Sequence, residues 1–330
     1  MKFSLIVCTY LRPEALLRLL LSVQQQTLYP DEILIIDGST NDATKTVVQQ
    51  YVFDNLVYYK VLDHERGLTK QRNYGILRVG DAIDVVCFLD DDTVLEANYF
   101  EQLILTFEND RSITGVGGVA INENRWKLSK PNKQYNRKKT YQFDGFIYEE
   151  GLRNVMRNYL KLQSDLDPGR MPDFSHGKTC GFPLNGKSYE VDLLIGMSMA
   201  FRKVVVDSIK FSFYFEGYGL YEDADFSIRA LQFGKNVINT KVQLHHYHDA
   251  AGRPNQYWYG KMVVRNGWYV WRTKNPKPSV KHKLKWHAIT IVLTVIRFTN
   301  VITSSSRKEA LTEALGRTIG WWSLWISKPK

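Results

Sequence analysis

Three consecutive aspartates, Asp90, Asp91 and Asp92, are the residues whose types and spacing most directly suggest chemistry in this sequence. They follow an uninterrupted apolar run over 85–89, which is typical of a strand covered on both faces. Adjacent carboxylates repel one another, so folding alone does not favour them at the end of a buried strand. A divalent cation would neutralise them, because carboxylate oxygens are hard ligands. Two interpretations stay open: a cation site that holds a diphosphate, and a solvated acidic turn or helix cap.

The elements that must position these aspartates are predicted from alternating apolar runs and helical patterns. The predicted strands are 3–8, 33–36, 56–62, 85–89 and 116–121, and helical patterns cover 14–26, 43–51 and the segment that begins at 67. Repeats of one strand and one helix over roughly 25–30 residues predict βαβ units and a mainly parallel sheet. Ligands bind beyond the carboxyl ends of such strands, so loops 9–12, 37–42 and 90–92 are expected to meet at one edge.

Composition sets the broad class of the protein. A length of 330 residues is enough for one large domain or two. The net charge of +10 indicates an anionic partner, which could be a nucleotide, a phospholipid or a nucleic acid. Of the cysteines, Cys8 and Cys87 fall in predicted buried strands and Cys180 does not, which indicates small apolar thiols in a reducing compartment. The N-terminal apolar run is short and has no small-residue cleavage site, so it is expected to be a strand.

Six segments of the chain together resemble a known family. In order along the chain they are IVCTYLRP, ILIIDGSTNDAT, GLTKQRNYGI, CFLDDDTVLEANYF, LLIGMSMAFRK and GYGLYEDADFSIRALQFGK. With this order and spacing, residues 1–250 resemble the inverting glycosyltransferases of family 2. The resemblance implies the GT-A nucleotide-sugar-binding fold, an α/β fold with a central, mostly parallel sheet, and a Mg²⁺ or Mn²⁺ cofactor.

The resemblance places nucleotide-binding residues at the ends of the first strands and in the third helix. Thr9, Tyr10 and Arg12 would line the nucleotide pocket. Asp37 would accept hydrogen bonds from the base or ribose, and the alternative for this residue is a turn or cap aspartate. Arg72 would approach the diphosphate, because its planar fork matches phosphate oxygens. A surface arginine is the alternative for Arg72.

The metal site implied by the resemblance uses the acidic run. Asp92 would ligate the metal, Asp90 would contact the ribose or the metal, and Asp91 would belong to the nucleotide site or point elsewhere. Three histidines in the segment LHHYH follow a predicted strand over 236–244. Because relatives place a histidine after this strand, His245 is expected to bind the metal or diphosphate. A structural histidine is the alternative.

A second acidic group, Glu222 and Asp223, lies more than 120 residues beyond the first. Inverting transfer requires a general base that takes the proton of the acceptor hydroxyl. The resemblance assigns this role to Asp223, with Glu222 as its orienting partner or as the base itself. The alternative is that both are acids that complement a helix dipole. Asp225 is expected to be structural, paired with Arg229 one helical turn later.

The acceptor side is defined by fewer residues. Gly196 and Met197 resemble the acceptor-side turn of the family, and Asp192 is expected to contact the donor or acceptor sugar. Between Asn124 and Phe143 the chain has seven lysines and arginines and no acid. The simplest interpretation of this stretch is a flexible basic loop, and the sharper one is a lid or a contact for an anionic acceptor.

The C-terminal third has a different pattern. An amphipathic helix is predicted over 256–269, and a basic linker over 274–285. The apolar stretch 286–296 has 11 residues, which is too short to span a bilayer. Basic residues beside tryptophan-rich amphipathic helices indicate peripheral attachment to an anionic membrane, and the alternative is that these helices pack on the main domain.

The predicted organisation is a catalytic domain over 1–255 and a helical region over 256–330. The domain is expected to contain a nucleotide-binding half, a variable basic insertion and an acceptor half with the base, over 1–121, 122–190 and 191–255. No long bundle of membrane-spanning helices follows the catalytic region, which favours transfer of single sugars over polymer extrusion.

The predicted function is a metal-dependent, inverting glycosyltransferase of the bacterial cell-surface polysaccharide type. Its donor would be a nucleotide sugar, with UDP the commonest choice, and its acceptor a glycan or a lipid-linked glycan. The predicted location is cytoplasmic and peripheral, at the inner face of the cell membrane. A sugar nucleotidyltransferase is the alternative enzyme, but it would not need the base at Glu222 and Asp223. A basic nucleic-acid-binding protein is disfavoured, because the sequence has no helix-turn-helix, zinc-finger or RNP pattern.

Overall fold

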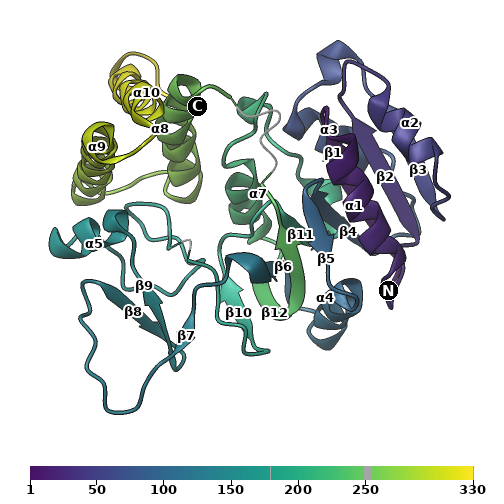
Figure 1. Ribbon diagram of the computed structural model, residues 1–330, viewed down its shortest axis with the longest axis horizontal. Coiled ribbons are helices and arrows are strands. Elements are labelled where there is room, and N and C mark those ends of the chain that lie inside the picture. The colour runs from purple at the N-terminus through teal and green to yellow at the C-terminus, as the bar shows by residue number, and fades with distance from the viewer. Residues whose placement is uncertain (179, 249–253, 330) are drawn as a thin grey trace. The chain divides into compact units, whose positions relative to one another are not determined.

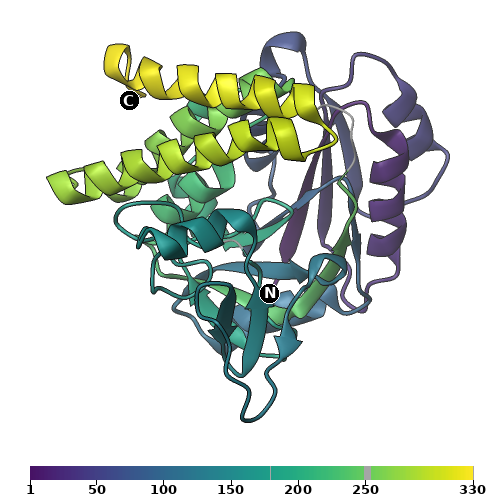
Figure 2. The same cartoon turned by 60° about the vertical axis from the view of Figure 1, so that its left-hand side comes forward.

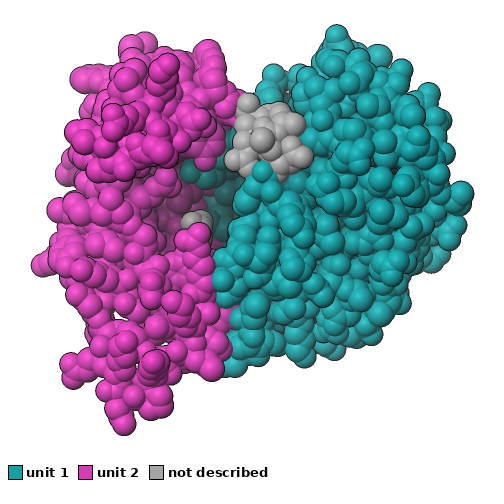
Figure 3. Space-filling model, viewed as in Figure 1, with its two compact units in different colours: residues 1–124, 184–253 teal, residues 125–183, 254–330 magenta. Residues whose placement is uncertain are grey.

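The computed structural model describes residues 1–178, 180–248 and 254–329. The chain forms two compact units, each made of two segments of the sequence (Figure 3). Unit 1 contains residues 1–124 and 184–253, and unit 2 contains residues 125–183 and 254–330. The central insertion and the C-terminal helices, which the sequence pattern suggests as separate regions, therefore fall in one compact unit.

Unit 1 is an α/β unit built on a nine-stranded sheet in the order β10-β12-β6-β11-β4-β1-β2-β3, with β5 paired to β12 (Figure 1). Its strands are β1 (Phe3–Thr9), β2 (Glu32–Asp37), β3 (Leu56–Lys60), β4 (Val85–Asp90), β5 (Thr93–Leu95), β6 (Ile113–Ala120), β10 (Ser188–Val191), β11 (Ser198–Arg202) and β12 (Lys235–His246). Strands β4, β1, β2 and β3 are mutually parallel, as are β6 and β12, and β11 runs antiparallel between β4 and β6. The predicted α/β fold with a mostly parallel central sheet is confirmed.

Helices cover this sheet with their apolar sides. They are α1 (Pro13–Gln24), α2 (Ala43–Gln49), α3 (Leu68–Ile76), α4 (Tyr99–Asn109), α6 (Lys203–Ser208) and α7 (Glu222–Ala230), with short 3-10 turns at η1 (Asp63–Glu65), η2 (Ile121–Glu123) and η3 (Phe213–Phe215). Pro13 stands in the first turn of α1, where its missing N–H is not needed. Leu16, Leu19 and Leu20 of α1 are fully buried in the same core cluster as the apolar residues of β1 and β2. Burial on both faces explains the uninterrupted apolar runs of these strands.

The strand register brings three loops to one edge of the sheet. Thr9 at the end of β1 pairs with Asp37 at the end of β2, and Cys8 pairs with Asp90 at the end of β4. These strands therefore end at the same level, and the loops that follow them begin side by side. The three cysteines are free thiols, and Cys87 is buried in β4.

The described part of unit 2 contains a small antiparallel sheet and four helices. Its elements are β7 (Lys127–Leu128), β8 (Thr140–Phe143), β9 (Phe146–Glu149), α5 (Leu152–Tyr159), α8 (Gln256–Lys274), α9 (Val280–Thr303) and α10 (Arg307–Ile326). The interpretation of the basic stretch after Asn124 as a flexible loop is wrong at the two ends of the stretch, where β7 and β8 both pair with β9. The ring of Trp126 packs on Tyr141, Phe143 and Tyr148, and this aromatic cluster stabilises the hairpin.

The three long helices pack through glycines and one buried carboxylate. A Cβ atom on Gly316 would lie 2.0 Å from the Tyr257 carbonyl oxygen, so α8 and α10 meet backbone to backbone. Glu313 of α10 is 2% exposed; it lies 2.8 Å from Arg317 Nε and 2.6 Å from Arg297 Nη2 of α9. Figure 2 shows α9 and α10 running side by side.

Two sequence expectations for this region are corrected. The basic linker is shorter than predicted, because α8 ends at Lys274 and α9 already begins at Val280. The apolar stretch 286–296 is the middle of the 24-residue helix α9. The prediction that this stretch is too short to span a bilayer therefore does not apply to the whole helix. By length and composition, α9 is the one helix among the described residues that could cross a membrane.

Candidate functional site

The loops after β1 and β4 are joined through Asp91. Thr9 Oγ1 donates a hydrogen bond of 2.7 Å to Asp91 Oδ2, and Arg12 Nη1 lies 3.0 Å from Asp91 Oδ1. Burial raises the pKa of Asp91 to about 7, although Arg12 and Thr9 oppose the rise. Asp91 therefore holds the edge of the sheet together, and its contact with a nucleotide stays a prediction.

Asp37 is fully buried at the end of β2, and both of its oxygens have protein partners. Ser39 N–H donates to Oδ1 at 2.7 Å, and the Tyr58 hydroxyl donates to Oδ2 at 2.6 Å. This geometry is that of a turn aspartate that also anchors β3. Tyr10, in the neighbouring loop, is 37% exposed and is available to a ligand.

A group of two carboxylates and one imidazole lies beyond β4 and β12. Ligand atoms of Asp90, Asp92 and His246 all lie within 4.8 Å of one another, and His246 Nε2 is 3.3 Å from Asp92 Oδ1. Burial opposes protonation of His246, but the hydrogen bond to Asp92 and the negative charges of Asp92, Asp90 and Glu123 together outweigh burial and raise the pKa of the imidazole. Burial also raises the pKa of Asp90, against the effect of Arg72. Two oxygen donors and one nitrogen donor fit a divalent cation such as Mn²⁺ or Mg²⁺.

The histidine in this group is His246, and the expectation for His245 disagrees with the geometry. Successive residues of a strand point to opposite faces, so the two histidines at the end of β12 diverge. His245 Nε2 lies 3.1 Å from Glu96 Oε1, away from the aspartates. The sequence identified the cluster of histidines, and the described residues place His246, not His245, beside the two aspartates.

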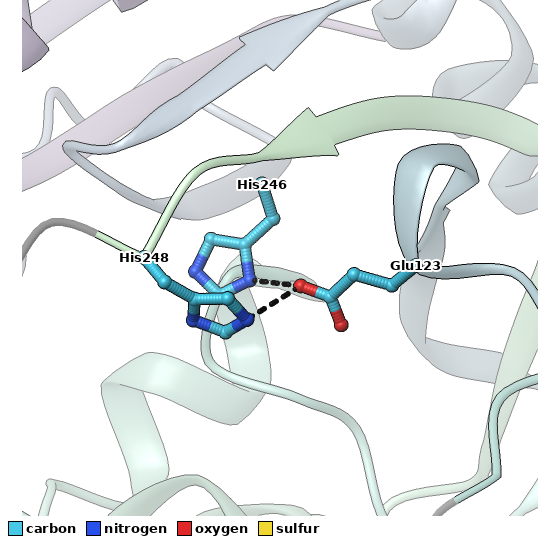
Figure 4. Close-up of side chains that lie close together, drawn as sticks. All are labelled: Glu123, His246 and His248. Atoms are coloured by element: carbon cyan, nitrogen blue, oxygen red, sulfur yellow. Dashed lines mark hydrogen bonds and ion pairs between the residues drawn. The ribbon is translucent and has the colours of Figure 1, made fainter.

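Glu123 connects His246 to a third histidine (Figure 4). Its Oε1 atom lies 3.0 Å from His246 Nδ1 and 2.7 Å from His248 Nε2. Asn122 fixes η2 against the end of β12, since its amide donates to the His246 carbonyl at 2.8 Å and accepts from the His246 N–H at 3.0 Å. Glu123 is thus held where it fixes the orientation of the His246 ring.

Arg72 of α3 joins the two acidic groups. It is 2% exposed; its Nη1 atom forms an ion pair with Glu222, and its Nη2 atom lies 3.3 Å from Asp90 Oδ1. Its guanidinium also lies 5.2 Å from the ring centroid of Phe211. Burial disfavours its charge, but Glu222 and Asp90 outweigh burial and raise the pKa of Arg72. The alternative of a surface arginine is wrong, and a contact with a diphosphate stays a prediction.

Asp223 stands in the first turn of α7 and is half-buried. Gly196 N–H donates to its Oδ2 at 2.9 Å, and Ala224 N–H donates to its Oδ1 at 2.8 Å. Burial raises the pKa of Asp223, while these two amides oppose the rise. Burial likewise raises the pKa of Glu222 to about 8, against the effect of Arg72. Glu222 Oε2 is buried and has no hydrogen-bond partner among the described residues.

The remaining predicted residues have different surroundings. Gly196 contacts Asp223 as described, and a Cβ atom there would lie 3.2 Å from Arg72 and 3.3 Å from Glu222. Met197 is part of the hydrophobic core, and Asp192 is buried after β10. Asp225 accepts from Arg229 Nε at 2.9 Å and from Arg229 Nη2 at 2.7 Å, so the predicted structural pair is confirmed.

The comparisons with known proteins agree with this fold. The fold resembles GT-A structures: the mannosyltransferase PcManGT from Pyrobaculum calidifontis, solved with GDP-Man and Mn²⁺, aligns with 100% of this chain and 76% of its own, at a TM-score of 0.50 and 12% identity. Residues 4–161 match the model of the family described as glycosyl transferase family 2. The resemblance to glycosyltransferase family 2 is thus confirmed over residues 4–161 of the chain.

Two curated relatives share part of the sequence. A glucosyl-dolichyl phosphate glucuronosyltransferase of Haloferax volcanii is 33% identical over 135 residues, which are 40% of this chain and 41% of the relative. The O-antigen chain rhamnosyltransferase RfbN of Salmonella typhimurium is 27% identical over 159 residues, which are 47% of this chain and 49% of the relative. The chain is thus matched to less than half the length of each.

Proposed function

We propose that the chain transfers one sugar, with inversion, from a metal-bound nucleotide-diphosphate sugar to a glycan or lipid-linked acceptor. The observation that carries this proposal is the position of Arg72 between Asp90 and Glu222. The Arg72 guanidinium lies between Asp90, which belongs to the acidic group suited to hold a cation, and Glu222, which belongs to the acidic group suited to act as a general base. Inverting transfer needs these two groups on either side of one sugar.

The residues that would hold the cation are Asp92, His246 and Asp90. When bound there, a divalent cation would offset the negative charge of the departing diphosphate. Asp223 is proposed as the base, because its carboxylate is half-buried and oriented by two backbone amides. Glu222 is proposed to hold Arg72 in place, and its free Oε2 atom is suited to accept a hydrogen bond from the substrate.

The relatives support the substrate class. One relative is named a glucosyl-dolichyl phosphate glucuronosyltransferase, and another is named an O-antigen chain rhamnosyltransferase. These names support an acceptor on a lipid carrier and a role in cell-surface polysaccharide assembly. UDP is proposed as the nucleotide, with GDP as the first comparison because PcManGT was solved with GDP-Man. The base pocket is proposed to lie at Thr9, Tyr10 and Arg12, with Asp37 as the buried turn residue that supports it.

A peripheral location at the inner face of the cell membrane is proposed from α9 and α10. Large apolar side chains stay exposed on both helices, among them Val295, Ile302, Trp322 and Ile326. Basic residues accompany them, which suits an anionic lipid surface. Co-sedimentation with anionic vesicles and not with zwitterionic ones is expected, and equal recovery with both would contradict the electrostatic part of this proposal.

Calorimetric titration of UDP, dTDP and GDP with and without Mn²⁺ tests the proposed function. We expect one nucleoside diphosphate to bind in a Mn²⁺-dependent manner, and Asp92→Asn to weaken that binding. With the matching nucleotide sugar and acceptor, the product should be the nucleoside diphosphate. Release of pyrophosphate would instead identify a nucleotidyltransferase. If no nucleotide binds with the metal present, the proposed donor site is wrong.

A further inference from the structure

A groove of about 760 Å³ lies in unit 2, among α8, α9 and the end of α10. Four aromatic rings line it, from Trp268, Tyr269, His287 and Trp325. Val280 and Leu284, from the start of α9, also line it and are 72% and 65% exposed. Large apolar side chains that stay exposed around a concavity of this size are typical of a ligand site.

The groove is cationic, and the described residues provide no counterion for it. Arg272, Lys283 and Lys328 line it, and none of them has a carboxylate partner among the described residues. The sequence from residue 254 onward has only two acids, Glu309 and Glu313. Glu313 is already buried between two arginines of α9 and α10. Three cations at one apolar groove therefore favour an anionic ligand.

The imidazole of His287, which is held in place by neighbouring rings, adds a neutral hydrogen-bond donor to the wall of the groove. Trp321 Nε1 donates to His287 Nδ1 at 3.0 Å, and the His287 ring stacks on Trp325 with centroids 5.6 Å apart. Burial lowers the pKa of His287, and Lys328 adds to this effect. A neutral ring whose Nδ1 accepts carries its proton on Nε2, so it offers an N–H donor.

The lining distinguishes between classes of ligand. Recognition of a glycan uses acceptors for sugar hydroxyls, but no Asp, Glu, Asn or Gln stands among the residues that line the groove. Apolar surface instead continues along α9, where Ile291 and Val295 are exposed. An amphiphile with an anionic head and an apolar chain matches both properties.

We propose that this groove binds the phosphate or diphosphate head of a membrane lipid. Arg272, Lys283 and Lys328 neutralise the head group, and its apolar chain lies against Trp325 and Leu284. Binding of the lipid phosphate is inferred from the groove alone. The assignment of that lipid as the sugar acceptor rests on the proposed function.

Calorimetry on the full chain tests the proposal with three probes: farnesyl diphosphate below its micelle concentration, inorganic pyrophosphate and farnesol. Farnesyl diphosphate is expected to bind at least about 10-fold more tightly than either fragment. Lys283→Ala combined with Lys328→Ala should weaken its binding by about 10-fold, and Trp325→Ala by a similar factor. These side chains are exposed, so the variants are expected to fold.

Matched controls lie on the same helices. Lys281 is an exposed lysine of α9 outside the groove, and Trp322 is 58% exposed on α10 where Trp325 is 63% exposed. Lys281→Ala and Trp322→Ala should leave the affinity unchanged. Equal binding of pyrophosphate and farnesyl diphosphate, or equal losses in the control variants, would overturn the lipid site. Mn²⁺-dependent nucleotide binding, measured on the same samples, reports separately on the proposed function.

Discussion

Replacement of Glu123 by glutamine is expected to weaken metal binding without removing any metal ligand. Glu123 Oε1 lies 3.0 Å from His246 Nδ1, and His246 Nε2 lies 3.3 Å from Asp92 Oδ1. A carboxylate that accepts from Nδ1–H leaves the Nε2 lone pair for the cation and increases its basicity. In Glu123→Gln the side chain keeps an acceptor oxygen but loses the charge, and with its NH₂ group turned toward the ring it favours the wrong tautomer.

The size of the effect follows from how outer carboxylates act on metal-bound histidines. Their loss typically weakens metal affinity by about 10–100-fold, which is about 1.4–2.8 kcal/mol. The side chain of Glu123 is 43% exposed, so water screens its charge and the lower end of this range is expected. The measurement is the electron paramagnetic resonance signal of free Mn²⁺, titrated into the protein in the presence of the nucleoside diphosphate.

The structure provides a matched control for this prediction. Glu96 pairs with His245 at 3.1 Å, and its side chain is also 43% exposed, but this pair lies apart from the aspartates. Glu96→Gln should therefore leave the Mn²⁺ affinity unchanged, and His246→Ala should reduce it far more than His245→Ala. Equal affinities for the Glu123 and Glu96 variants would refute the role of Glu123, and a larger loss at His245 would refute the choice of histidine.

Three further predictions concern the base and the helical unit. Asp223→Asn should lower kcat by about 10²–10⁴-fold while Mn²⁺-dependent nucleotide binding is kept, and full activity would contradict the assignment of the base. Because burial raises the pKa of Asp223 and a base works deprotonated, kcat/KM should fall as the pH drops through a value above that of a free aspartate; a profile that is flat down to about pH 4 would contradict this. Gly316→Ala should destabilise unit 2 by at least about 1–3 kcal/mol in denaturant unfolding, because its Cβ would lie 2.0 Å from a backbone oxygen. Gly320→Ala, where the nearest such distance is 3.0 Å, should cost less, and the reverse order would contradict the close helix crossing.

Much of unit 1 was predictable because strands that are buried on both faces have uninterrupted apolar sequences. The apolar runs at 3–8, 33–36 and 85–89 correspond to β1, β2 and β4, whose parallel pairing needs both faces covered. Their register then places Thr9, Asp37 and Asp90 at one edge without further information. The family resemblance added the pair at Glu222 and Asp223, whose distance in the sequence gives no sign that Arg72 connects them.

What the sequence could not provide was the direction of individual side chains. The segment LHHYH offers three histidines, and only the phase of β12 decides which of them meets Asp92. Gln71 was missed for a similar reason: its side chain donates to the Thr9 and Ile36 carbonyls at 3.2 and 2.8 Å and so joins the ends of β1 and β2. A polar residue on a helix that covers the edge of a sheet is a clue that its side chain joins strand ends. The sequence pattern of the helix alone does not show in which direction that side chain points.

In unit 2 the difficulty is different, because one sequence pattern is compatible with several environments. Lysines beside tryptophans predicted a membrane surface, and the same residues now divide into two sets. Lys283 and Trp325 line a groove, whereas Lys281 and Trp322 are exposed outside it. A bilayer surface would bind both sets through general charge and apolar area, but a defined lipid phosphate would need only the first. The paired substitutions therefore separate recognition of one lipid head from attachment to a membrane, which composition alone cannot do.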